Sequence, residues 1–284
     1  MFKNHVKKYL LRTVTEVEER IFYSTGLSYT LKWVRNRHIN SLPTSLGQNL
    51  LKYYNFLCSN EYPEEVFKDK NITRCSSFKI KYLKRNARKK ISLNLVKYGI
   101  VQLINQRNRP SGVSEDILKL PEMAKVWHKI YSATMEDSVG HDPVLSKILE
   151  LNNSALATEI SVWSSPREFL RRGTIPDSNF KCKARDLFTG HIDLLLYDNE
   201  LQKLIVADYK PENMFLKSLP QVAIYGLMMK KILNIKSLKC LSFSRRKAWL
   251  YDPEILRTEI PRYIRRNGNP KLYWQWILTG LKKY

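Results

Sequence analysis

The stretch TGHIDLLLYDNELQKLIVADYK (residues 189–210) contains two apolar runs with a polar turn between them. We expect strands over 190–197 and 202–208, because Asp198-Asn199-Glu200 between them is typical of a tight turn. The second run ends in Leu204-Ile205-Val206-Ala207, which is typical of a buried strand. Further strands are expected over 155–162, 238–243 and 248–251. The stretch therefore predicts a hairpin inside a larger sheet.

Helical patterns flank these strands. One begins at Ser114, continues to Ile130, is broken near Gly140-His141-Asp142-Pro143 and resumes over 144–151. Another begins at Ser218 and repeats its apolar residues at helical spacing, and one or two more are expected near the C-terminal end. This order of helices and strands predicts an α/β protein with a mixed central sheet flanked by helices.

Asp193, Asp208 and Lys210 are the ionisable residues of this stretch that bear most on function. Asp208 and Lys210 are two positions apart, so they point to one face of a strand, about 6.6 Å apart, if the strand continues to Lys210. If the turn has an even number of residues, Asp193 on the neighbouring strand shares that face. An odd turn would place the two aspartates on opposite faces. We expect the even turn, with both carboxylates and the lysine in one pocket.

This combination of residues indicates a particular chemistry. Two carboxylates so close together repel each other unless a cation lies between them, and oxygen ligands of this kind suit Mg²⁺ or Mn²⁺. A bound divalent ion acidifies water, and the ion and a lysine together neutralise charge that develops on a phosphate. The pattern indicates metal-dependent hydrolysis of phosphodiester bonds. The alternative is a pair of surface aspartates at strand ends beside a solvated lysine.

Three segments match known motifs: Gly190-His191-Ile192-Asp193 matches GxxD, Asp208-Tyr209-Lys210 matches D-Y-K, and Gln221-Val222-Ala223-Ile224-Tyr225 matches QxxxY. In this combination the chain resembles the PD-(D/E)xK nuclease superfamily, and its RecB-like branch in particular. The resemblance covers residues 115–251 and implies a restriction-endonuclease-like core. It departs from the superfamily name at Ile192, where the name has proline.

The resemblance implies roles for the motif residues. Asp193 and Asp208 hold Mg²⁺ or Mn²⁺, with the Tyr209 carbonyl as a further ligand. Lys210 orients or deprotonates the attacking water and stabilises the charge on phosphorus. In the third motif Gln221 and Tyr225 are neighbours on one helix face, where they contact the DNA strand or brace the lysine. A purely structural role for Tyr225 is core packing.

The same branch has a histidine on an upstream helix and a glutamate on the first strand. His128 lies on the expected helix, so we expect it to be a metal ligand, although a lone helical histidine is more often a packing residue. Glu159 lies on the expected strand and is predicted to bind the metal or to orient water. His191 is a weaker candidate. It stays a candidate because residues two apart on a strand share a face, so it is on the same face as Asp193.

The chain has 284 residues, with 49 Lys and Arg against 26 Asp and Glu, a net charge of +23. Such an excess indicates a polyanionic partner, and nucleic acid first. Residues 1–110 contain 22 basic and 7 acidic residues, a net charge of +15, and are densest in cations over 79–90. This cluster is either a solvated helix face or a surface that binds nucleic acid.

Residues 105–112 have the composition of a loop, which marks a domain boundary. We expect a basic, mainly helical nucleic-acid-binding region over 1–110 and a nuclease domain over 111–284.

The four cysteines, Cys58, Cys75, Cys182 and Cys240, are widely scattered without a CxxC pair. This spacing argues against a zinc ribbon, a disulfide framework and an iron–sulfur cluster. The sequence has no run of 18 apolar residues and no signal or transit sequence at its start. We therefore expect an intracellular protein in a reducing compartment, cytoplasmic or nucleoid-associated, that does not contact a membrane.

The sequence thus predicts a metal-dependent deoxyribonuclease, and the motifs favour a RecB-like exonuclease that acts on DNA ends or single strands, for example in DNA repair. One alternative is a structure-selective endonuclease such as a junction resolvase. Another is a basic nucleic-acid-binding protein without catalysis, against which the carboxylates count because they repel phosphates. A membrane-surface protein is the weakest alternative, since no lipidation motif or long amphipathic face adjoins the basic cluster.

Overall fold

The computed structural model describes residues 16–24, 27–80, 85–134, 140–165, 187–211, 215–260 and 262. Nine strands within these ranges form one mixed, mostly antiparallel sheet in the order β1-β2-β5-β6-β7-β8-β9-β4, and β3 pairs with β6 outside this path. The pairs β3–β6 and β7–β8 run parallel. The strands are β1 Glu18–Ser24, β2 Leu27–Trp33, β3 Thr73–Arg74, β4 Val101–Ile104, β5 Ala155–Ser164, β6 Phe188–Asp198, β7 Lys203–Tyr209, β8 Lys239–Phe243 and β9 Ala248–Tyr251.

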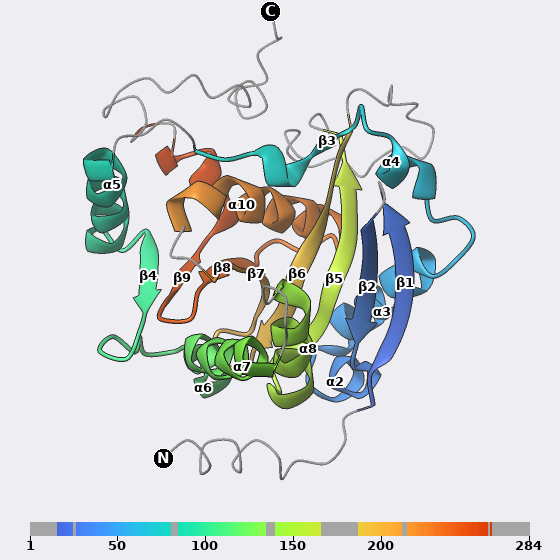
Figure 1. Cartoon of the computed structure of the whole chain (residues 1–284), viewed down its shortest axis with the longest axis horizontal. Coiled ribbons are helices and arrows are strands. Elements are labelled where there is room, and N and C mark those ends of the chain that lie inside the picture. The colour runs from blue at the N-terminus through green and yellow to red at the C-terminus, as the bar shows by residue number, and fades with distance from the viewer. Residues whose placement is uncertain are drawn as a thin grey trace, which may run out of the picture.

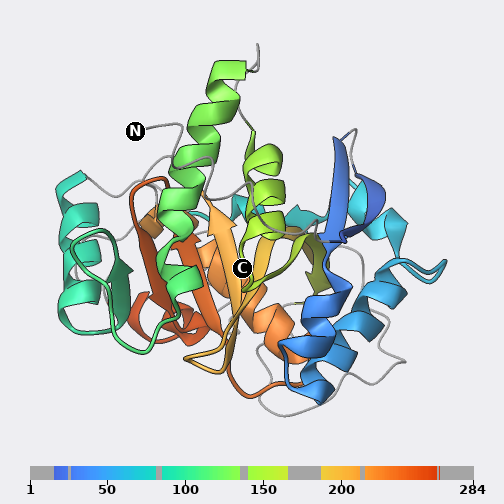
Figure 2. The ribbon, with the colours of Figure 1, turned by 90° about the horizontal axis from the view of Figure 1, so that it is seen from below.

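Helices cover both faces of this sheet (Figures 1 and 2). The α-helices are α2 Arg35–Asn40, α3 Thr44–Leu57, α4 Glu64–Lys68, α5 Arg85–Lys97, α6 Glu115–Leu118, α7 Leu120–Thr134, α8 His141–Leu151 and α10 Phe215–Ile232, and the 3₁₀ helices are η1 Cys75–Ser77 and η3 Pro253–Leu256. Leu195 and Val206 pack in the hydrophobic cluster of α10, whereas Leu194 and Ile205 pack in that of α6, α7 and α8. The strands alternate in this way because successive side chains point to opposite faces. The expected α/β class, with a mixed sheet flanked by helices, is confirmed.

The hairpin β6–β7 has an even turn. Its turn comprises the four residues 199–202, and Leu194 of β6 pairs with Ala207 of β7. One step further along this register, Asp193 comes opposite Asp208. The alternation of the hairpin therefore brings the two aspartates to the same end of the sheet, as the even turn predicts.

The described part of the region before residue 110 contains the strands β1 to β4 as well as the helices α2 to α5, so helices are not its only elements. β1 and β2 form a hairpin that joins β5 through Lys32 and Trp33, and β4 forms the opposite edge of the sheet beside β9. The hydrophobic cluster of α10 also includes residues from both sides of the expected boundary, such as Leu50 and Leu227. The N-terminal region is thus built into the same sheet and core as the rest of the described chain.

Most other expected elements agree with the structure to within a few residues. The strands expected at 155–162, 238–243 and 248–251 are β5, β8 and β9, and the helix expected from Ser218 is α10, which begins at Phe215. Part of the basic cluster, Cys182 and the expected C-terminal helices lie outside the described residues. Among the described helices, none combines the length and the apolar character needed to cross a membrane.

Candidate active site

The two aspartates and the lysine of the hairpin meet at the C-terminal end of β7. Lys210 Nζ donates a hydrogen bond to Asp208 Oδ1 at 2.9 Å and lies 3.9 Å from Asp193 Oδ2. Asp208 is 1% exposed and Asp193 is 9% exposed, so both carboxylates are buried. We call these three residues, together with Glu159 and His141 described below, the carboxylate cluster.

Backbone hydrogen bonds hold this end of β7 from both sides. The Tyr209 N–H donates to Asp193 Oδ2 at 3.0 Å, and the Lys210 N–H donates to the Phe243 carbonyl of β8 at 2.9 Å. The Tyr209 ring is buried, with its centroid 5.2 Å from that of Phe243, and its hydroxyl has no hydrogen-bond partner among the described residues. These contacts extend the ordered backbone as far as Lys210, which keeps the lysine beside Asp208.

A histidine outside the expected set lies beside Asp193. His141 is the first residue of α8, and its Nδ1 lies 3.4 Å from Asp193 Oδ2. Gly140 precedes it as the N-cap residue, and Pro143 lies in the first turn, where a missing N–H breaks no helical hydrogen bond. The segment expected as a break in the helical pattern is therefore the start of a helix that points its first side chain at the carboxylates.

Glu159 joins the cluster from β5. Its neighbours on β5 pair with the residues that flank Asp193 on β6, and it lines a small cavity of about 50 Å³ with Asp142 and Lys32. Its backbone φ is 53°, in a region that few residues other than glycine adopt. Such a conformation persists only where the surrounding structure imposes it, and it is commonest at functional sites. The geometry therefore favours a site role for Glu159.

The cluster shifts the pKa values of its two aspartates in opposite directions. Burial opposes the ionisation of both carboxyls. At Asp193, the charge of Lys210 and the hydrogen bonds from His141 and Tyr209 outweigh burial and lower the pKa. At Asp208, burial and the charge of Asp193 outweigh Lys210 and raise the pKa to about 7. Asp193 is thus the more readily ionised member of the pair, and further positive charge nearby would favour the ionisation of Asp208.

The pKa values of Glu159 and Lys210 are also shifted by burial and by the neighbouring carboxylates. Burial, followed by the charges of Asp193 and Asp142, raises the pKa of Glu159 to about 9. Burial opposes the charge of Lys210, but the two aspartates outweigh it, so the pKa of the lysine is raised and its amine is a cation at neutral pH. One ammonium, that of Lys210, therefore faces three carboxyl groups and does not keep all three ionised.

The cluster has the donor atoms of a divalent-cation site. As its side chains stand, no group of three or more His, Cys, Asp or Glu residues in the described part of the chain is arranged to hold a metal ion, and Lys210 is the cation between the aspartates. However, Asp208 Oδ2 is buried without a hydrogen-bond partner among the described residues. A cation would satisfy this oxygen and offset the surplus negative charge, so the residues present fit Mg²⁺ or Mn²⁺.

Gln221 and Tyr225 of α10 are buried behind the cluster. Gln221 Nε2 donates a hydrogen bond to the Tyr225 hydroxyl at 3.2 Å. The Tyr225 ring packs so closely on Gly190 of β6 that a Cβ atom at residue 190 would overlap it. The glycine of GxxD and the tyrosine of QxxxY therefore touch each other. In this arrangement the pair supports β6, the strand that carries Asp193.

This contact gives a stability prediction. We expect Gly190→Ser to lower the free energy of unfolding by about 1–3 kcal/mol, because the added side chain overpacks the interface with Tyr225. Gly140→Ser is the matched control, since no atom lies within 4 Å of a Cβ there and serine is as good as glycine at an N-cap. Urea unfolding of both variants tests the contact, and equal effects at the two positions would contradict it.

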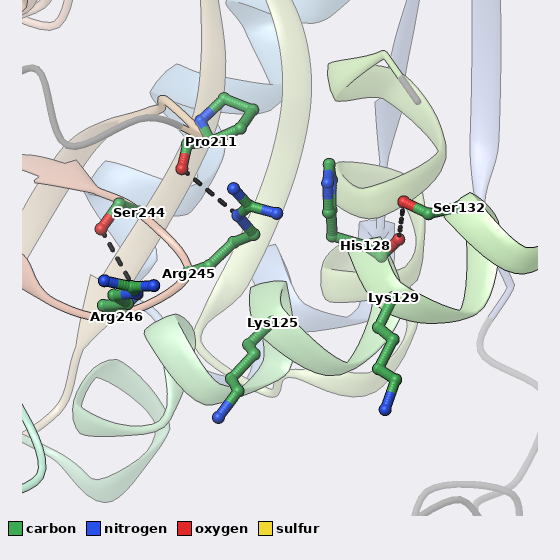
Figure 3. Close-up of a pocket in the computed structure, with 8 residues that line it drawn as sticks. All are labelled: Lys125, His128, Lys129, Ser132, Pro211, Ser244, Arg245 and Arg246. Atoms are coloured by element: carbon green, nitrogen blue, oxygen red, sulfur yellow. Dashed lines mark hydrogen bonds between the residues drawn. The ribbon is translucent and has the colours of Figure 1, made fainter. Parts of the chain in front are cut away.

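The structure does not bring His128, the predicted metal ligand on α7, together with the carboxylate cluster. It is on α7 and lines a pocket with Pro211 and Arg245 (Figure 3). Burial and the charge of Arg245 lower its pKa. The helix directs this histidine to the β8–β9 turn, where its charged neighbour is an arginine rather than a carboxylate.

His191 also has neighbours other than carboxylates. Its ring stacks on Tyr29 with centroids 3.8 Å apart and planes 6° apart. Burial and the charge of Arg74 lower its pKa to about 3. The imidazole is therefore neutral and belongs to an aromatic group between β2 and β6.

No protein-family model matches the chain, and comparisons with curated proteins and with solved structures give no match either. The fold and the site therefore define an α/β protein in which two buried aspartates and a partly exposed lysine meet at the end of a central strand.

Proposed function

We propose that this protein is a metal-dependent nuclease of the PD-(D/E)xK superfamily that hydrolyses phosphodiester bonds in DNA. The observation that carries this proposal is the meeting of Asp193 and Asp208, both buried, with the partly exposed Lys210. The alternative reading of the sequence, surface aspartates beside a solvated lysine, requires exposed carboxylates. Burying two neighbouring carboxylates is costly, so a role in stability alone is a poor explanation for them.

In this proposal Asp193, Asp208 and His141 hold Mg²⁺ or Mn²⁺, with the Tyr209 carbonyl as a further ligand. The bound ion supplies positive charge at the phosphate and acidifies water. The unpaired Asp208 Oδ2 and the raised pKa of that carboxyl support this assignment, because a cation satisfies the first and offsets the second.

Lys210 acts on the reacting phosphate. Its raised pKa favours an ammonium that donates hydrogen bonds to the attacking water or to a phosphate oxygen, rather than an amine that removes a proton. It stabilises the negative charge that develops as water attacks phosphorus and the bond to the leaving oxygen breaks. Glu159 faces the same carboxylates and orients the water. Gln221 and Tyr225 are positioning residues.

The RecB-like combination of motifs favours an exonuclease that acts on DNA ends or single strands. Comparing linear with circular DNA, and single strands with duplexes, separates this activity from a structure-selective endonuclease. Cleavage of covalently closed circles at the rate of linear DNA would favour the endonuclease.

The test of the proposed function is metal-dependent cleavage. Purified protein is expected to degrade DNA with Mg²⁺ or Mn²⁺ and to lose this activity when EDTA removes the metal. The measurement is release of fluorescent nucleotides from a labelled linear duplex. DNA binding that is the same with and without EDTA, with no cleavage in any metal, would favour a non-catalytic binding protein.

A further inference from the structure

A basic cleft lies beside the end of β7, between α7 and the turn that joins β8 to β9 (Figure 3). It encloses about 580 Å³, and its charged lining includes Lys125, Lys129, Arg245 and Arg246. A second cavity of about 720 Å³ shares these four cations and extends the cleft toward α6. We refer to the two together as the α7 cleft.

Two hydrogen bonds to backbone carbonyls connect the cleft to the candidate active site. Arg245 Nε donates to the Pro211 carbonyl at 3.3 Å, and Pro211 directly follows Lys210. The Lys210 N–H in turn donates to Phe243, the last residue of β8. The β8–β9 turn is therefore fixed to the strand end that carries the lysine, which places the cleft next to that end of β7.

The turn itself is ordered by Ser244. Its N–H donates to the Lys247 carbonyl at 2.9 Å, and its Oγ accepts from the Arg246 N–H at 3.3 Å. In Figure 3 the guanidinium of Arg245 points toward His128, while Lys125 and Lys129 extend together from α7. Since residues four apart are neighbours on a helix, the two lysines form a row about 6 Å long.

The charges and side-chain types of the lining identify a ligand class. The described residues that line the first cavity include no carboxylate and no Phe, Tyr or Trp, and their one ring is the imidazole of His128. In the second cavity, six cations line the walls with two carboxylates, Glu115 and Glu122, and Glu115 forms ion pairs with Arg109 and Lys119. Such an excess of cations over carboxylates binds phosphates, whereas a platform for stacked bases is built mainly from Phe, Tyr and Trp.

We propose that the α7 cleft binds the sugar–phosphate backbone of the nucleic-acid strand next to the scissile phosphate, through Lys125, Lys129, Arg245 and Arg246 and without reading bases. This inference rests on the proposed nuclease function, which it deepens by placing the substrate. Phosphate contacts fix the position of a strand but carry no sequence information. The cleft therefore sets where the strand lies relative to Lys210.

The test is DNA binding by a charge-reversal variant of the full chain. We expect Lys125→Glu/Arg246→Glu to weaken binding of a fluorescent 30-nucleotide strand about tenfold or more at about 100 mM salt, and to reduce the slope of log K against log salt by about 1.5–2. Binding is measured by fluorescence anisotropy in EDTA. Oligo(dT) and a mixed sequence are expected to lose affinity equally.

The matched control is Lys52→Glu/Lys236→Glu, which changes the net charge equally at two exposed lysines outside the cleft. We expect its affinity to stay within about twofold of the wild type. Equal weakening in both variants, or a loss confined to one sequence, would overturn the inference. Cleavage of DNA by the wild type with Mg²⁺ is measured separately. Cleavage without the binding contrast refutes the cleft alone, and the contrast without cleavage refutes the nuclease alone.

Discussion

Asp208→Asn and Lys210→Met are each expected to lower the rate of metal-dependent DNA cleavage by about 10³-fold or more. Asp208 offers the unpaired buried oxygen of the cluster, and an amide cannot replace its charge toward a cation. Lys210 supplies the ammonium that faces the reacting phosphate, and Met fills similar space without charge. Single-turnover cleavage of a labelled linear duplex measures both losses.

Lys203→Met is the matched control for the lysine. Lys203 lies at the other end of the same strand, where its Nζ bonds to Ser237 Oγ at 2.6 Å. We expect this variant to cleave within about twofold of the wild-type rate. Urea unfolding shows whether each variant still folds. A folded Asp208→Asn or Lys210→Met protein with full activity would refute the proposed chemistry.

The central hairpin could be predicted from the sequence because its turn and its two strands are determined by residues that are close together along the chain. The polar residues between two apolar runs limit the turn to a few lengths, and the alternation of a strand then fixes which side chains share a face. Asp193, Asp208 and Lys210 are consequently placed together by spacing alone. The four-residue turn of the structure is one of the two even turns compatible with that spacing.

The N-terminal strands could not be predicted in the same way, because they depend on distant partners. β2 becomes part of the main sheet by pairing Lys32 and Trp33 with β5, more than 120 residues later, and β4 depends on β9. A high density of Lys and Arg also says nothing about backbone conformation. Charge therefore indicates a type of partner for residues 1–110, which stays a prediction, and says nothing about their secondary structure.

Only part of the candidate site could be predicted, because some of its features also depend on the folded structure. The alternating neighbours of Glu159 predict that it lies on a strand, but nothing in the sequence indicates its positive φ. His141 was missed because glycine and proline around it are typical of a loop. Only the helix geometry shows that Gly140 caps α8 and that Pro143 is tolerated in its first turn. The sequence thus placed the carboxylates together and pointed to His128, whereas the structure places His141 beside Asp193.

His141→Ala is therefore expected to raise the Mn²⁺ concentration needed for half-maximal cleavage about 10–100-fold, whereas His128→Ala leaves it within about twofold. His141 Nδ1 lies 3.4 Å from Asp193 Oδ2, so removing the imidazole takes away a nitrogen donor and a partner that orients the carboxylate. His128 faces Arg245 in the α7 cleft, where its loss affects contacts to the strand rather than the metal.

The two variants form a matched pair, because each removes one imidazole from a helix next to the end of β7. Isothermal titration calorimetry with Mn²⁺, without DNA, measures the affinity for metal separately from catalysis. A weaker Mn²⁺ affinity in His128→Ala, with no change in His141→Ala, would restore His128 as the ligand. It would also mean that α7 moves toward the carboxylates when metal binds, since the helix otherwise directs His128 at an arginine.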